Sequence, residues 1–385
     1  MYTACSYQEP IEVTTTTNAV VKKEDKTYVK AVWFTYYELS IMIKRKSEND
    51  FKKSIKNAFK KVKSMGFNTV TVQIRPFADA FYKSKYFPTS EYITEKQGDE
   101  IEYDPLLIMC ETAKSLDLKI EAWINPYRIS NGSDINKLSG KNIAKKWYKG
   151  KKKNNVYVSK SGIFFNPASD DVINLIVNGV KEIVSSYSID AIHFDDYFYP
   201  TKDKEIDKTN YKKYKGKLSL ADFRREKVSN MIKKVYKAIK SINPDVQFGI
   251  SPAANIKEDY NNLYADVTRW AKEEGYCDYI CPQVYFGFKN VYQPFMFTVK
   301  KWVSITEKEL YIGLPLYKAG LPDKYAAQEN KSNINEFVNN NNIIARQIEY
   351  VTKIGEIKGY YVFSYGCLED ERCKKEVDNM LKVMK

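Results

Sequence analysis

Residues 188–200, with the sequence SIDAIHFDDYFYP, read as a short buried strand that runs into two adjacent carboxylates, Asp195 and Asp196. Parallel α/β enzymes place their functional groups in this way, at the carboxyl ends of the strands. Side chains alternate between the two faces of a strand, so His193 and Asp195 share one face and Phe194 shares the other with Asp196. The alternative is an Asp-Asp turn that only caps the next segment, but the aromatic residues that follow are costly to expose without a ligand.

A regular β/α alternation surrounds this strand. Seven further strands are predicted at residues 31–35, 68–75, 118–125, 246–250, 278–285, 310–314 and 360–364. Helices are predicted at residues 50–65, 105–116, 168–186, 219–242, 263–274, 292–307, 343–354 and 369–383. The first of them carries Phe51, Ile55 and Phe59 on one face and ends at Gly66, as an amphipathic helix with a glycine cap should. Strict alternation of strand and helix predicts a single (β/α)8 TIM barrel.

The competing fold is an open, doubly wound sheet. That fold would need a glycine-rich phosphate loop after the first strand, and residues 35–38, with the sequence TYYE, offer none. Long loop insertions follow strands 2, 3, 4 and 7, on the face where the loops of a barrel build a binding site. We expect residues 29–385 to form one catalytic barrel and residues 1–28 to form a flexible N-terminal tether.

The chain is basic, with 62 Lys and Arg against 48 Asp and Glu and a net charge of +14. This charge favours an anionic partner such as an acidic wall polymer, whereas no nucleic-acid-binding signature is present in the sequence. No segment reaches the roughly 18 apolar residues that a membrane helix needs. With a single histidine and six dispersed cysteines, no metal site and no organic cofactor are predicted.

Residues 3–6, with the sequence TACS, are similar to the end of a bacterial lipoprotein signal, although the apolar segment that should precede them is absent. On this basis Cys5 is a candidate lipid-attachment site. We therefore expect an extracellular or cell-envelope location.

Aromatic, amide, arginine and carboxylate side chains gather at the predicted carboxyl ends of the strands. This combination is typical of a carbohydrate site, where rings stack on sugars and polar groups bind hydroxyls. The candidate substrate-binding residues are Tyr36, Gln73, Arg75, Asp79, Trp123, Asn125, Arg128, His193, Tyr197, Gln283 and Tyr285.

Cleavage of a glycosidic bond needs a carboxylic acid that protonates the leaving oxygen, and usually a second carboxylate across the sugar. Asp195 is the first candidate, and Asp196, Glu38 and Glu121 are candidates for the partner. Burial of Glu121 would raise its pKa, as a general acid requires. The structural alternatives are that Glu121 pairs with Arg75 and that Glu38 caps the next segment.

At these residues the chain resembles the glycoside-hydrolase-like family ten proteins, a bacterial group of (β/α)8 barrels. The matching segments include AVWF (31–34), GFNTV (66–70), VQIRP (72–76), AWINPYR (122–128), FNP (165–167) and PQVY (282–285). The resemblance implies a secreted or envelope enzyme that acts on glycans. Clostridial surface relatives are peptidoglycan lytic transglycosylases, which need only one general acid/base because the muramic 6-hydroxyl is the attacking group.

The chain departs from related patterns at two points. Many relatives carry a histidine at the position of Glu121, which is then either inert or newly catalytic here. Residues 190–197 echo the chitinase pattern D-x-x-D-x-D-x-E, but Tyr197 replaces the glutamate that acts as the acid. We expect cleavage of the peptidoglycan glycan strand, by lytic transglycosylation or by hydrolysis. The alternative is a non-catalytic glycan-binding barrel, and the oligomeric state stays open.

Overall fold

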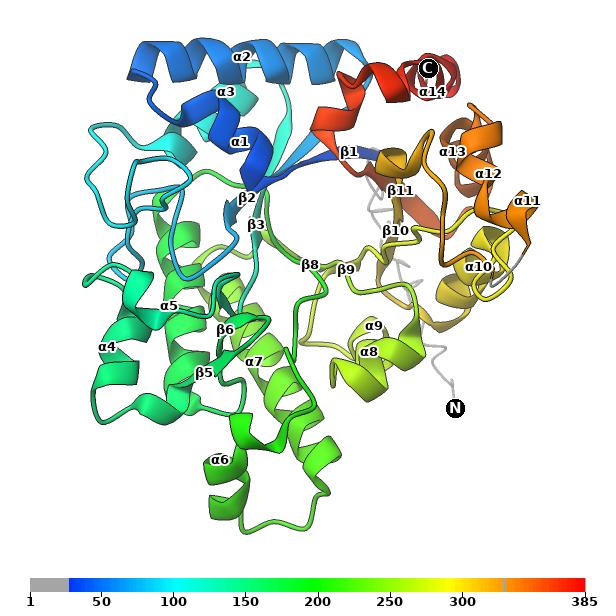
Figure 1. Ribbon diagram of the computed structural model, residues 1–385. Coiled ribbons are helices and arrows are strands. Elements are labelled where there is room, and N and C mark those ends of the chain that lie inside the picture. The colour runs from blue at the N-terminus through cyan, green and yellow to red at the C-terminus, as the bar shows by residue number, and fades with distance from the viewer. Residues whose placement is uncertain (1–27, 328–329, 385) are drawn as a thin grey trace, which may run out of the picture.

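The computed structural model describes residues 28–327 and 330–384, so Cys5 and nearly all of the expected tether lie outside the described residues. Parallel strands close into one barrel (Figure 1): β1 (Val29–Phe34), β2 (Thr69–Arg75), β3 (Lys119–Ile124), β7 (Ala191–Phe194), β8 (Gln247–Ile250), β9 (Tyr279–Ile280), β10 (Glu309–Leu314) and β11 (Ile357–Val362). Each strand predicted from the sequence corresponds to one of these. The prediction of a (β/α)8 TIM barrel is confirmed.

Helices surround the barrel, as Figure 1 shows: α2 (Glu48–Ser64), α3 (Pro105–Ser115), α5 (Asp170–Ser186), α7 (Leu220–Ile242), α10 (Phe295–Ile305), α13 (Ile343–Val351) and α14 (Lys374–Val383). Serine side chains cap the amino ends of three of them, namely Ser47 for α2, Ser169 for α5 and Ser219 for α7. Gly66 follows α2 with φ +90°, a conformation that favours glycine and ends the helix there. In the described part of the chain, no helix is long and apolar enough to cross a bilayer.

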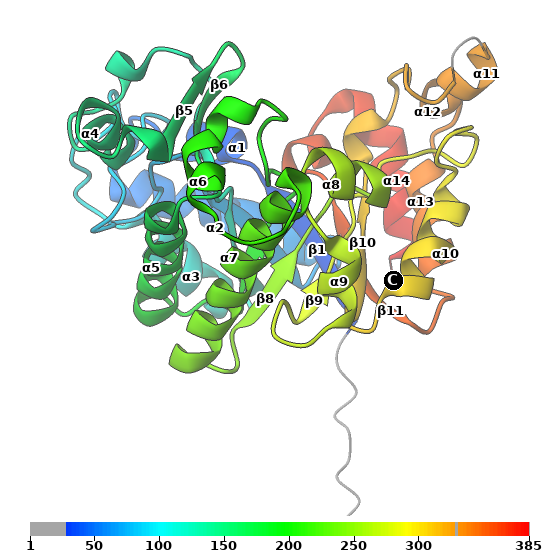
Figure 2. The ribbon, with the colours of Figure 1, turned by 90° about the horizontal axis from the view of Figure 1, so that it is seen from below.

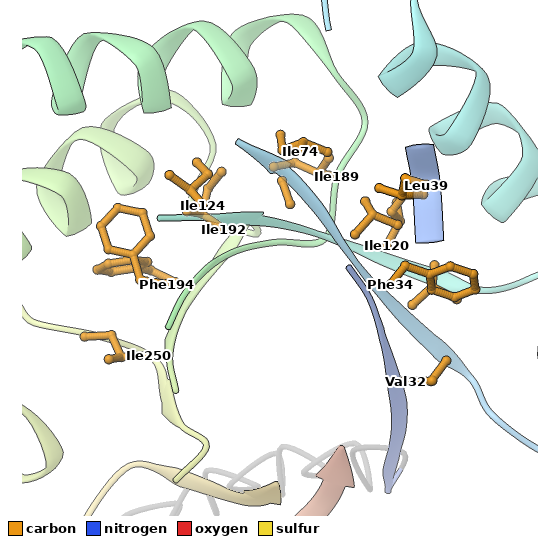
Figure 3. Packing of buried hydrophobic residues seen from close by; sticks show 14 of the residues in the cluster. Val32, Phe34, Leu39, Ile74, Ile120, Ile124, Ile189, Ile192, Phe194 and Ile250 are labelled. Carbon is orange, nitrogen blue, oxygen red and sulfur yellow. The ribbon is translucent and has the colours of Figure 1, made fainter. Parts of the chain in front are cut away.

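The main core lies between the barrel and the helices. Figure 3 shows Val32 and Phe34 of β1, with Ile192 and Phe194 of β7, pointing away from the barrel axis. All four are fully buried, so the outer faces of the strands are covered by helices. The inner faces carry a separate cluster of larger rings, which includes Trp33, Trp123, Tyr279, Tyr311 and Tyr361. Two-residue alternation along each strand separates these two sets of side chains.

The insertions carry secondary structure that the sequence analysis did not predict. After β3, the strands β4 (Arg128–Ser130), β5 (Val156–Ser159) and β6 (Gly162–Phe165) form a small antiparallel sheet, accompanied by α4 (Ile143–Lys149). Further short helices are α6 (Lys208–Lys213) after β7, and α11 (Lys331–Ile334) and α12 (Glu336–Asn339) after β10. Figure 2 shows β5, β6, α11 and α12 at the same end of the barrel. This is the end at which the barrel strands finish.

Two helices differ from the prediction. The expected helix at 263–274 is replaced by α8 (Ile256–Asn262) and α9 (Val267–Lys272), because Tyr264 adopts φ +50° and interrupts the helical path. A further helix, α1 (Tyr36–Ile43), follows β1 directly. It places Tyr36 and Tyr37 in its first turn, just after the carboxyl end of β1.

Candidate active site

Asp195 lies immediately after β7 and is 4% exposed. Its Oδ2 atom accepts hydrogen bonds from Trp123 Nε1, at 3.1 Å, and from the side-chain amide of Asn125. Its Oδ1 atom accepts from the backbone N–H of Tyr197 at 3.2 Å. Trp123 and Asn125 come from the end of β3, the strand that pairs with β7. Three donors from two neighbouring strand ends therefore fix the orientation of this carboxylate.

Asp195 and Asp196 are coupled electrostatically. Burial, together with a smaller contribution from the neighbouring carboxylate of Asp196, raises the pKa of Asp195 to about 7. Burial also raises the pKa of Asp196, which accepts a hydrogen bond from Gln283. The positive charge of Arg128 acts in the opposite direction and lowers the pKa of both carboxyls. Two like charges this close do not both ionise readily, so the pair retains one proton near neutral pH.

A relay of amide hydrogen bonds connects Asp195 to the start of α1. The backbone N–H of Tyr36 donates to Gln73 Oε1 at 3.0 Å, and Gln73 Nε2 donates to Asn125 Oδ1 at 2.7 Å. Asn125 then directs its amide nitrogen to Asp195. The side-chain oxygens of Gln73 and Asn125 each accept a hydrogen bond, so the NH2 group of each amide points toward the next residue in the relay. These hydrogen bonds fix the orientation of both amides. The structure thus brings together four residues that the sequence analysis assigned to the site.

His193 lies below Asp195 in the barrel interior. Its Nε2 atom accepts from Trp33 Nε1 at 3.3 Å, and its Nδ1 atom lies 2.9 Å from the hydroxyl of Tyr279. Burial lowers the pKa of His193 to about 3, so the ring is neutral at physiological pH. Tyr279 fits here because Gly249 lacks a side chain, and a Cβ at that position would lie 1.8 Å from the Tyr279 ring. Both ring nitrogens of His193 are therefore occupied by groups other than Asp195.

Glu121 lies deeper in the interior, on the same face of β3 as Trp123. Its two carboxylate oxygens accept from the hydroxyls of Tyr361 and Thr71, each at 2.7 Å. Burial raises the pKa of Glu121 to about 7. Its partners are thus interior hydroxyls, and the ion pair with Arg75 considered from the sequence is not formed.

Arg75 points away from the site, contrary to expectation. The pairing between β2 and β3 shifts register between Gln73 and Arg75, so that Arg75 lies opposite Ile124 and shares its outward direction. The guanidinium lies 4.4 Å from the centre of the Phe87 ring and is 1% exposed. A Cβ on Gly179 of α5 would lie 2.7 Å from Arg75 Nη1, so the arginine packs between the barrel and this helix. Arg75 is therefore a buried structural residue that packs between β2 and α5.

Asp79 and Glu38 hold loops in place. Asp79 is buried and accepts from Gln97 Nε2 at 3.0 Å, and burial raises its pKa to about 7. Glu38 forms a capping box with Thr35, whose backbone N–H donates to Glu38 Oε2 at 2.6 Å. The other oxygen of Glu38 accepts from Ser364 Oγ at 2.6 Å and from the backbone N–H of Gly366. One oxygen of Glu38 thus caps the start of α1 and the other joins α1 to the segment after β11, which supports the capping alternative.

The remaining predicted residues surround the acids at the mouth of the barrel. Arg128 lies between two rings, 4.7 Å from the centre of Phe77 and 4.4 Å from that of Tyr197. Gln283 donates to the carbonyl of Ser251 at 3.0 Å as well as to Asp196. Tyr285 contacts two neighbouring rings, Tyr317 at 5.6 Å and Phe363 at 5.9 Å between centroids.

Phe77, Tyr92 and Phe363 are the site residues that sequence reasoning missed. Phe363 follows β11 directly, so its position at a strand end could have identified it. Phe77 and Tyr92 lie in the long connection after β2, where no periodicity indicates which rings face the site.

A hollow of about 1450 Å³ opens at the opposite end of the barrel, where the strands begin. Residues that precede or start strands line it, among them Asn68, Lys119, Asp190 and Lys358. In TIM-barrel enzymes the chemistry takes place at the carboxyl ends of the strands, and conservation at the amino ends serves stability. The Asp195–Asp196 pair, and not this hollow, is therefore the candidate active site.

Comparison of the fold with solved structures places the chain among TIM-barrel proteins. The glycoside hydrolase domain of PgaB (BpsB) from Bordetella bronchiseptica superimposes with a TM-score of 0.61 over 93% of this chain and 99% of that chain, at 10% sequence identity. Alpha-L-fucosidase isoenzyme 2 from Paenibacillus thiaminolyticus gives a TM-score of 0.58 over 92% of this chain and 49% of that chain, at 13% identity. At these identities the similarity concerns the fold alone.

Sequence comparison finds nearer relatives. "Glycosyl hydrolase YngK" of Bacillus subtilis (strain 168) is 38% identical over 285 residues, which cover 67% of this chain and 54% of the relative. "Glycosyl hydrolase DigH" of Escherichia coli (strain K12) is 35% identical over 288 residues, which cover 68% of this chain and 64% of the relative. The matches thus span between half and two thirds of these relatives. The profile of the family described as "Glycosyl hydrolase-like 10" matches residues 28–330, and the chain belongs to this family.

Proposed function

We propose that the protein cleaves glycosidic bonds at the Asp195–Asp196 pair. The observation that carries this proposal is a pair of coupled carboxyls at the end of a barrel strand, with a raised pKa on each. Amides and rings surround the pair, the combination that binds and orients sugars. The family name and the names of the relatives support the same reaction class.

The two carboxyls have different roles in this proposal. Asp195 receives two N–H donors on one oxygen, which stabilise its ionised form, so it supports positive charge that develops at the anomeric carbon. The retained proton belongs to the coupled pair, and Asp196, the less buried of the two carboxyls, is the one from which it passes to the leaving oxygen. In the second half of the reaction, Asp196 takes a proton back from the attacking hydroxyl. That hydroxyl belongs to water in hydrolysis, or to the muramic 6-position in lytic transglycosylation.

The proposed substrate is the glycan strand of peptidoglycan. The resemblance to clostridial surface enzymes supports this substrate. The net charge of +14 favours an anionic polymer. Arg128 lies beside the acids, where it can bind a carboxylate of the substrate. An extracellular or envelope location is part of this proposal because peptidoglycan lies outside the cytoplasmic membrane. Cys5 remains the proposed lipid-attachment site.

Product analysis tests the proposal. The protein is incubated with purified peptidoglycan, and the soluble products are analysed by mass spectrometry. Anhydro ends would identify a lytic transglycosylase and new reducing ends a hydrolase. If the protein binds the polymer but releases no fragment, the chain is the non-catalytic glycan-binding barrel and the proposed activity is wrong.

A further inference from the structure

Six side chains form a continuous row that begins beside the acids and ends on α1; we call it the ring row, and its members are Tyr197, Arg128, Phe77, Tyr92, Tyr36 and Tyr37. The Arg128 guanidinium contacts the rings of Tyr197 and Phe77 at 4.4 and 4.7 Å. Phe77 then stacks on Tyr92, with centroids 5.9 Å apart and 17° between the ring planes. Each member of the row is therefore in contact with the next.

The far end of the ring row lies on the first turn of α1. The Tyr92 ring lies 4.7 Å from that of Tyr36 and 6.4 Å from that of Tyr37, between centroids. These residues come from the segments that follow β1, β2, β3 and β7, which are adjacent strands of the barrel. The ring row thus passes over one side of the barrel mouth rather than around it.

Exposure increases toward the two ends of the ring row. Phe77, which lies between Arg128 and Tyr92 in the row, is 4% exposed, whereas Tyr197 is 49% and Tyr37 is 64% exposed. Tyr36, Tyr92 and Arg128 are half-buried. The row therefore presents flat rings, phenol hydroxyls and a guanidinium to solvent, which together suit the alternating C–H and hydroxyl surface of a sugar chain.

The ring row is also held rigidly. The backbone of Tyr36 donates to Gln73, which begins the amide relay to Asp195. Glu38 fixes the same turn of α1 to Thr35, Ser364 and Gly366. A surface that is ordered before binding loses little conformational freedom when a ligand docks.

We propose that the ring row binds an extended glycan strand that leads away from the Asp195–Asp196 pair, so that the enzyme prefers polymers to short fragments and cuts inside the strand. This inference rests on the proposed function and adds to it a surface that selects for chain length. The alternative occupant is a second copy of the chain, because Ile41, which is exposed, lies one turn from Tyr37 on α1.

The test uses Tyr37→Ala, with Tyr37→Phe to retain the ring and Phe297→Ala as a control on the outer helix α10, where Phe297 is equally exposed. The substrates are stem-free peptidoglycan glycan strands and the smallest fragment that the wild type still cuts. We expect Tyr37→Ala to lower kcat/KM for the strands about tenfold, through KM, as the loss of one ring contact implies. For the short fragment, kcat/KM should stay within about twofold for all three variants.

Equal losses on both substrates, or none on the strands, would overturn the inference. Light scattering that shows a wild-type dimer and a Tyr37→Ala monomer would also overturn the inference, because the ring row would then be an interface between copies. If the wild type cuts neither substrate, the proposed function fails, and sedimentation with sacculi still tests the ring row. In that case Tyr37→Ala should weaken binding to sacculi and Phe297→Ala should not, and equal binding of both variants would contradict the inference.

Discussion

At the scale of single residues, Asp195 and Asp196 differ in what surrounds each carboxylate. Asp195 is fixed by Trp123, Asn125 and the backbone of Tyr197, whereas Asp196 is the more accessible carboxyl and contacts Gln283. A proton donor matters most when the leaving group is a poor one. We therefore expect Asp196→Asn to lower kcat/KM for glycan strands about 10²- to 10⁴-fold and to have a much smaller effect on an activated aryl glycoside.

Steady-state kinetics on the two substrates measures this difference, with Asp195→Asn expected to be impaired on both. The pair loses its proton as the pH rises above about 7, so wild-type kcat/KM for the strands should fall there. Equal loss on both substrates in Asp196→Asn would assign the proton donor elsewhere.

Glu121 gives a prediction about stability. Burial raises its pKa to about 7, above the value of about 4.3 for an unfolded chain, so the folded state binds the proton more tightly. The resulting stabilisation is present at low pH and is lost as the pH rises from about 4 to 7. Glu121→Gln removes this loss. At about 1.4 kcal/mol per pKa unit, the substitution should raise the free energy of unfolding above pH 7 by roughly 4 kcal/mol.

Urea unfolding at pH 4 and pH 8 measures this effect, with the exposed residue Glu100→Gln as control. The gain should be present at pH 8 and nearly absent at pH 4. A gain of equal size at both pH values would show that Glu121 does not titrate in this range.

Residue-scale prediction from the sequence succeeded where strand alternation is regular. Gln73, Asn125 and Asp195 were assigned to the site because they end predicted strands, and the structure joins them by hydrogen bonds. Arg75 was misplaced because a register shift in β2 reverses its direction. Two-residue counting cannot detect such a shift, since it depends on pairing with the neighbouring strand.

At the scale of elements, the segment after the acids is held by a buried ion pair. Arg224 of α7 contacts both oxygens of Asp207, at 2.7 and 2.8 Å, and also donates to the hydroxyl of Tyr264. Tyr199 donates to the same carboxylate at 2.5 Å. Because Arg224 and Asp207 are both fully buried, removal of one partner leaves the other charge uncompensated.

We therefore expect Arg224→Met to lower the free energy of unfolding by about 3–5 kcal/mol. The double variant Arg224→Met/Asp207→Leu should recover much of this loss, because it leaves no isolated charge. Thermal unfolding checks both, and Arg45→Gln, at an exposed ion pair with Glu95, should leave Tm nearly unchanged. A loss below about 1 kcal/mol in Arg224→Met would show that this pair does not hold the segment.

Short elements were the least predictable part of the fold. Helix α1 was missed even though Thr35 and Glu38 have the spacing of a capping box, a signal that could have identified it. The sheet formed by β4, β5 and β6 was missed because its three- and four-residue strands are too short for a periodic pattern.

At the scale of the whole molecule, the barrel was predictable because its outer strand faces and its helices repeat one pattern of buried apolar residues along the chain. The ring row could not be predicted from the sequence, because it combines residues from four connections whose relative positions depend on barrel closure. Strand ends can be read from local sequence, whereas contacts between loops require the tertiary structure.

The most direct test of the account is the rate of glycan cleavage by Asp195→Asn on purified peptidoglycan strands. Asp245→Asn, at an exposed residue near the start of β8, is the matched control for the same substitution. We expect Asp195→Asn to lose at least about 10²-fold in kcat while it remains folded and still binds the strands, and we expect Asp245→Asn to retain wild-type activity. Cleavage by Asp195→Asn at the wild-type rate would contradict the account.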